Sequence, residues 1–214
     1  WNIRVESLVV SDAAGPWLHI DGILLRWAPA WLLRGELRIE ELRADSVEVA
    51  RIPKSRREEA PGGRGIPGIT FRAPPLTIHT LSIPSVTFGH EVLGRAASLE
   101  VLGFIMPTDP PGGRTAFLQV NRMDQGQDLR AYLDARFDQS AESMRLQLEV
   151  VESADGLLSH VLGLSDAGAL SLRLDGDGPS SGWRGGMDLS SSRWGSVTTA
   201  IALTFDEQIA AEIA

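Results

Sequence analysis

The sequence predicts a mainly β protein: one elongated, bent antiparallel sheet that forms an open β-groove of taco-like section, with one or two short helices. Apolar and polar residues alternate with period two in many short segments, as they do in half-buried strands. The 22 Gly and 12 Pro of the 214 residues fall between these segments, where turns are expected. No change of composition divides the chain, so residues 1–214 are expected to form a single continuous segment.

The clearest strands lie in the second half of the chain. In residues 129–137, the alternate positions are Leu, Ala, Leu, Ala and Phe, and the positions between them carry two arginines and an aspartate. Residues 146–150, 170–174 and 197–205 alternate in the same way. Because successive side chains of a strand point to opposite faces, each segment is expected to present one apolar and one more polar face.

In the first half of the chain, the alternation changes register several times. Within residues 37–49 the apolar positions switch parity, which predicts a bulge or bend near Glu41 and a turn near Asp45. Residues 76–88 switch parity twice. Pro84 lies in this stretch and cannot donate a ladder hydrogen bond, so it is expected at a bulge or an edge. The sheet is therefore expected to be bent.

Few helices and two loops are expected. Residues 155–164 predict a short helix with Asp155 as its N-cap, and residues 28–33 predict one helical turn after Pro29. Residues 53–68 combine charge, Pro and Gly without apolar periodicity, which predicts a mobile surface loop. Residues 109–114 predict a shorter loop.

Charge and composition exclude several classes of function. The 20 Lys and Arg against 28 Asp and Glu give a net charge of −8, opposite to that of a protein that binds nucleic acid. Cysteine is absent, which excludes disulfides, thiolate metal sites and cysteine nucleophiles. The most apolar stretch, residues 23–33, is too short to cross a bilayer. The chain begins at Trp1 without a leader sequence, so we expect a piece of a longer protein whose membrane anchor lies elsewhere.

Two glycine-rich motifs resemble catalytic or cofactor motifs but lack their context. Residues 178–182 fit G-x-S-x-G around Ser180, yet no histidine follows and the next residues are a poor helix start, so a hairpin turn is expected. Residues 63–68 fit G-x-G-x-x-G, but no strand precedes them and their prolines oppose a helix. Neither motif predicts a catalytic or a cofactor site.

The metal and acid–base candidates are equally weak. Residues 175–178 begin like a calcium loop but lack its later ligands, and the pair Glu152 and Asp155 is expected to be a solvated edge. The four histidines have no spacing typical of zinc ligands. They are His19, His79, His90 and His160. We therefore expect no enzyme activity, no metal and no cofactor.

The apolar face itself is the remaining candidate site, and two interpretations of it stay open. In a closed sandwich, a second sheet would cover this face. In an open, bent sheet, another apolar material such as acyl chains would cover it. The small aromatic content, 6%, slightly favours the open sheet. The residues expected to line such a groove are Leu37, Ile39, Val47, Val49, Leu76, Ile78, Leu129, Leu133, Leu146, Leu148, Val150, Leu170, Leu172, Leu174, Ile201 and Leu203.

Three of the six tryptophans, Trp17, Trp27 and Trp31, lie close together in the sequence. They are expected either to cap one end of the sheet or to contact lipid headgroups. The sequence leaves both alternatives open.

Two ordered blocks of sequence resemble the TamB family of AsmA-like proteins. The first block contains Leu8-Val9-Val10-Ser11-Asp12, Gly15-Pro16-Trp17-Leu18, Leu25-Arg26-Trp27-Ala28-Pro29, Leu32-Leu33-Arg34-Gly35, Leu37-Arg38-Ile39, Leu42, Val47 and Arg51-Ile52-Pro53. The second contains residues 146–152, Asp155-Gly156-Leu157-Leu158, Leu162-Gly163-Leu164, Leu172, Leu174, Gly176, Gly178-Pro179, Trp183-Arg184-Gly185 and Leu189. Together with residues 66–94, the blocks cover most of the chain.

This resemblance implies a section of a long periplasmic protein that is tethered to the bacterial inner membrane and reaches toward the outer membrane. Such proteins are similar to bridge-like lipid carriers with β-grooves that conduct phospholipids, and they are tied to outer-membrane protein assembly through the barrel partner TamA. The chain lacks the family's anchoring helix and its partner-binding region, so contact with the inner membrane and with a TamA-like barrel is expected through other parts of the protein. The expected direct partners are phospholipid acyl chains. The alternative implied function is a structural module of the translocation and assembly machinery.

Overall fold

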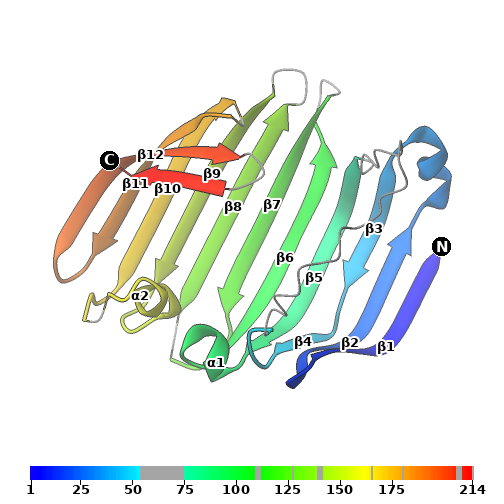
Figure 1. Cartoon of the computed structure of the whole chain (residues 1–214), viewed down its shortest axis with the longest axis horizontal. Coiled ribbons are helices and arrows are strands. Elements are labelled where there is room, and N and C mark those ends of the chain that lie inside the picture. Colours follow the sequence, from blue (N-terminus) through cyan, green and yellow to red (C-terminus); the bar gives the residue numbers. More distant parts are fainter. Residues whose placement is uncertain are drawn as a thin grey trace.

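The computed structural model of this chain describes residues 1–53, 75–108, 112–126, 128–138, 142–164, 166–179, 181–205 and 209–213, of which residues 203–205 and 209–213 are described by their backbone alone. The described residues form one thirteen-stranded sheet (Figure 1). Its strands are β1 (Asn2–Asp12), β2 (Gly15–Trp27), β3 (Leu37–Arg43), β4 (Ser46–Val49), β5 (Leu76–Phe88), β6 (Ala97–Pro107), β7 (Gly113–Arg122), β8 (Leu129–Asp138), β9 (Ser143–Glu152), β10 (Leu170–Pro179), β11 (Trp183–Ser191), β12 (Gly195–Phe205) and β13 (Ile209–Ile213). The predicted mainly β, open-sheet architecture is confirmed.

The strands follow one another across the sheet nearly in chain order, so most neighbours are antiparallel hairpins. β4 lies off the main path and pairs with β2 and β5. The pairings of β5 with β3 and with β4 are parallel, so the predicted antiparallel sheet is antiparallel in most but not all of its pairings. Parallel neighbours need a crossover connection of about a dozen residues or more, and the chain between Val49 and Leu76 is long enough for one. The predicted loop of residues 53–68 falls in this connection, and residues 54–74 lie outside the described part.

The predicted register changes are confirmed. In the β2–β3 ladder, Arg26 pairs with Glu41, and the next pair along the ladder leaves out one residue of β3. The β5–β6 ladder shifts in two places, and Pro84 lies in the second shift, between Ile83 and Val86. The chain leaves β3 and enters β4 around Asp45, where the sequence predicts a turn. Each shift returns the apolar residues to the same face of the sheet.

Three short helical segments lie beyond the strand ends. They are η1 (Pro29–Arg34), α1 (His90–Leu93) and α2 (Leu157–Val161). η1 confirms the predicted turn after Pro29. The predicted helix over residues 155–164 was too long, and Asp155 is not its N-cap: the cap residue is Gly156, and Asp155 adopts a positive φ of 56°.

The sheet is open and curled. β1 and β13 are its two edges and do not pair with each other within the described part of the chain. Figure 1 shows β12 and β13 crossing in front of the middle strands, on the side where α1 and α2 also lie. A path of twelve strands has eleven spacings of about 4.8 Å, so the face measured across the strands is about 53 Å long. Among the described helices, none has the length and apolar character needed to cross a bilayer.

Candidate functional site

The candidate site is the apolar face of the sheet, whose residues are aligned by strand register. Residues paired in register point to the same face. Leu133 on β8 pairs with Leu118 on β7 and with Leu148 on β9, and Leu148 pairs with Leu174 on β10. These four leucines form an unbroken apolar row across four strands.

A neighbouring row crosses nine strands, from β3 to β12. It consists of Ile39, Ile78, Ile105, Ala116, Ala135, Leu146, Gly176, Gly185 and Ile201. No charged residue interrupts this row. The register therefore gives the face a continuous apolar lining across most of the sheet.

The sequence-predicted lining residues with described side chains all lie on this face, because their register partners belong to adjoining apolar rows. Ile78, Leu129, Val150 and Leu170 are buried. The half-buried members are Leu37, Ile39, Val47, Val49, Leu76, Leu133, Leu146, Leu148, Leu172, Leu174 and Ile201. The side chain of Leu203 lies outside the described residues.

Sequence reasoning missed the lining contributed by β6 and β7. On the apolar face these strands carry Leu99, Val101, Ile105, Leu118 and Val120. On the opposite face they also carry apolar side chains, including the stacked rings of Phe104 and Phe117, whose centroids are 5.6 Å apart. Apolar residues at both parities obscure a period-two signal, so residues 97–122 did not stand out.

Among the described residues, helices cover the apolar face at one side only. Leu157 of α2 packs in a buried cluster with Ala97, Leu129 and Val150, and Leu93 of α1 packs against it. This cluster lies near the strand ends beside α1 and α2 in Figure 1. Elsewhere most residues of the face stay half-buried, which is typical of a sheet face without a second complete protein layer.

A hollow lies over the middle of the face. A cavity of about 160 Å³ is lined only by apolar residues: Ile78, Leu81, Phe104, Ile105, Ala116, Phe117, Leu118 and Leu133. By strand register six of them lie on the apolar face, whereas Phe104 and Phe117 belong to the opposite parity. Gly103 lies beside it on β6 and pairs with Leu118. The absence of a side chain at Gly103 leaves room for Leu118, whose Cδ1 lies 3.2 Å from the position that a Cβ would take.

Trp183 fills the face near β10 and β11. Its side chain has no exposed surface, and its ring covers Gly176 and Gly185, where an added Cβ would overlap the indole. Its Nε1 has no hydrogen-bond partner among the described residues. The sequence predicted few bulky rings in the lining. The Trp183 ring is one such ring, and it narrows the groove near its C-terminal strands.

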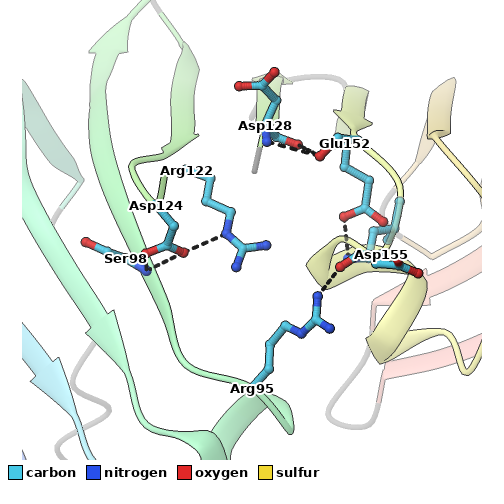
Figure 2. Close-up of polar contacts among 9 residues, drawn as sticks. Arg95, Ser98, Arg122, Asp124, Asp128, Glu152 and Asp155 are labelled. Atoms are coloured by element: carbon cyan, nitrogen blue, oxygen red, sulfur yellow. Dashed lines mark hydrogen bonds and ion pairs between the residues drawn. The ribbon is translucent and has the colours of Figure 1, made fainter. Parts of the chain in front are cut away.

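Glu152 anchors α2 at the side of the face, which corrects the prediction that Glu152 and Asp155 form a solvated edge. Only 1% of Glu152 is exposed. Its carboxylate accepts hydrogen bonds from the backbone N–H groups of Leu158 (2.7 Å) and Ser159 (2.6 Å), as Figure 2 shows in part. These N–H groups at the start of α2 have no intrahelical partner, so a carboxylate is a favourable acceptor there.

Two arginines extend toward the same side of the face (Figure 2). The Nε of Arg122 lies 2.7 Å from Oδ2 of Asp124, and the Arg122 side chain is only 4% exposed. Its Nη1 is buried and has no partner in the described chain. Arg95 donates to the backbone carbonyl of Asp155, just before α2. Polar groups thus border the apolar lining instead of interrupting its centre.

The described residues do not assemble the metal site that the histidine and carboxylate candidates could have formed. They include no group of three or more His, Asp or Glu side chains that could hold a metal ion. His19 contacts both Ser7 (2.8 Å) and Asp21 (3.0 Å), but through the same Nε2, whereas a nucleophile triad uses both ring nitrogens. Residues 178–182 connect β10 to β11 as a hairpin, with Gly182 N–H donating to the Pro179 carbonyl; Ser180 lies outside the described residues.

Comparisons with protein-family models, curated proteins and solved structures give no match for this chain. The resemblance to the TamB family therefore stays an expectation from the sequence.

Proposed function

We propose that this chain is a groove segment that conducts phospholipids, with acyl chains lying against the apolar face of the sheet. The observation that carries the proposal is the continuous apolar lining of an open sheet, against which the helices of the described residues, α1 and α2, pack at one side only. Each methylene removed from water contributes about 0.8 kcal/mol, so a lining without polar gaps stabilises an acyl chain at every position along its path.

Conduction also requires that no single position binds the lipid tightly. The lining consists of aliphatic side chains without a repeated polar anchor at its centre, so neighbouring positions offer similar contacts. Trp183 is the exception, because its buried ring occupies space beside Gly176. In this proposal, the groove lies in a periplasmic protein tethered to the inner membrane and passes phospholipids toward the outer membrane, as the sequence resemblance implies.

Native mass spectrometry of the purified protein tests this proposal. We expect bound phospholipid in the spectrum, and its loss in the variant Leu118→Asp, because Leu118 lines the apolar cavity and is only half-buried. Arg173→Ala is the matched control, since Arg173 is exposed and, by strand alternation, lies on the opposite face from Leu172 and Leu174. Circular dichroism should show that both variants remain folded. Bare wild-type protein, or equal lipid loss in both folded variants, would contradict the proposal.

A structural module for outer-membrane protein assembly is the second candidate. Strand β1 favours it, because within the described residues this eleven-residue strand pairs on one side only and presents exposed Ile3, Leu8 and Val9. An unpaired strand edge can add a strand from a partner chain. This function predicts lipid-free protein and a defect in assembly when Pro replaces a residue of β1, with lipid transport unchanged.

A further inference from the structure

The turn η1 forms a protruding tip between β2 and β3. It lies at a corner of the sheet, beyond the strand ends, in Figure 1. Trp31 N–H donates to the Ala28 carbonyl, and the N–H groups of Gly35 and Glu36 donate to the carbonyls of Leu32 and Trp31. Gly35 closes the turn with a φ of 74°, a conformation that suits glycine. The tip is therefore an ordered turn with internal backbone hydrogen bonds.

The tip exposes two leucine side chains to solvent. Leu33 is 92% exposed and Leu32 is 43% exposed. A single exposed leucine is ordinary on a protein surface, but two adjacent leucines at the end of a rigid turn form a small apolar projection. Because several of the turn's backbone groups are already paired with one another, this projection can enter an apolar medium at a reduced desolvation cost.

Next to the leucines in the sequence, the Trp31 indole is contacted by two arginines. The guanidinium carbons of Arg34 and Arg38 lie 4.8 and 4.6 Å from the centre of the Trp31 ring. Neither arginine has an ion pair with a carboxylate in the described part of the chain. The nearest acidic residue in sequence, Glu36, accepts a hydrogen bond from Thr77 Oγ1 (2.5 Å).

We propose that the η1 tip, Trp31 to Arg34 together with Arg38, docks on the surface of a bilayer that contains anionic phospholipid. The kinds of group present suit an interface: in the docked state the leucines reach the acyl region, the indole lies at the headgroup level, and the guanidinium groups meet phosphates. The whole chain has a net charge of −8, so a nonspecific attraction to an anionic surface is unfavourable and the two uncompensated arginines must orient the contact. This docking does not depend on what the groove carries.

The natural absence of cysteine allows a site-specific test on the full chain. Leu33→Cys is labelled with an environment-sensitive fluorophore and mixed with vesicles of phosphatidylcholine with and without phosphatidylglycerol. We expect a blue shift with the anionic vesicles. The matched site is Val161→Cys on α2, which is also exposed, at 62%, and which should give no shift.

A second measurement separates the contributions of the tip. In vesicle co-sedimentation, the double variant Arg34→Gln and Arg38→Gln should reduce binding at least about tenfold, since each basic residue near an anionic surface contributes appreciably to binding. Leu33→Asp should reduce binding similarly, whereas Leu162→Asp, just after α2, should leave it unchanged. Leu33, Arg34 and Leu162 are exposed and Arg38 is half-buried, so circular dichroism should show that the variants remain folded. Equal shifts at both labelled sites, no shift with vesicles, or a shift that appears only with another protein would overturn the proposal.

Discussion

Replacing Glu152 tests how α2 is held against the apolar face. Its carboxylate accepts from Leu158 N at 2.7 Å and from Ser159 N at 2.6 Å, and Glu152 is 1% exposed. In Glu152→Ala both N–H groups lose their acceptor, and an unpaired buried donor costs about 1–3 kcal/mol, so the expected loss is about 2–6 kcal/mol. Glu152→Gln keeps one acceptor oxygen, so its expected loss is smaller, about 1–3 kcal/mol.

Urea unfolding followed by circular dichroism measures these free energies, and hydrogen exchange at the amides of Leu158 and Ser159 measures the local effect. Both amides should exchange faster in Glu152→Ala. Glu149→Ala is the control, because Glu149 is exposed on the same strand and its loss should change the free energy of unfolding by less than about 0.5 kcal/mol. If Glu152→Ala unfolds like the control and keeps its amide protection, the anchoring role of Glu152 is refuted.

Three further predictions concern buried residues at the apolar face. Trp183→Ala should lower the free energy of unfolding by about 3–5 kcal/mol in urea denaturation, because the ring is fully buried; a loss below about 1 kcal/mol would show that it is not packed as described. Gly176→Ala should lower the thermal midpoint, since the added Cβ meets backbone atoms of Arg184 and Gly185 as well as the Trp183 ring; an unchanged midpoint would count against this packing. Arg122→Leu should lower calorimetric stability, because Asp124 loses the ion pair that the buried Arg122 guanidinium provides at 2.7 Å, and an unchanged stability would disprove that reasoning.

The sequence predicted those elements whose signal is local. Strands such as β8 and β9 alternate cleanly because one face is apolar and the other charged, and the bulges near Glu41 and Pro84 appear as parity changes in the sequence itself. The turn after Pro29 follows from proline's fixed φ. These features depend on neighbouring residues and need no knowledge of distant contacts.

The remaining features depend on distant contacts. The parallel pairing of β5 with β3 and β4 depends on how the chain crosses between them, which alternation does not encode. The role of Glu152 depends on where α2 docks, which the sequence does not show. In the sequence, a carboxylate with another charged residue nearby looks like a solvent-exposed residue. Trp183 is buried because the two glycines beneath it leave space for its ring, and that juxtaposition exists only once β10 and β11 pair.

Site-specific photo-cross-linking in cells tests most directly whether the apolar face contacts lipid. A photoreactive amino acid replaces Leu118 or Leu174, which belong to one apolar row. The control position is Gln147, which is exposed on β9 and, by strand alternation, lies on the opposite face from Leu148. If the apolar face contacts lipid, we expect phospholipid adducts at Leu118 and Leu174 and none at Gln147. Adducts to protein alone at the two leucine positions, or equal lipid adducts at all three positions, would contradict it.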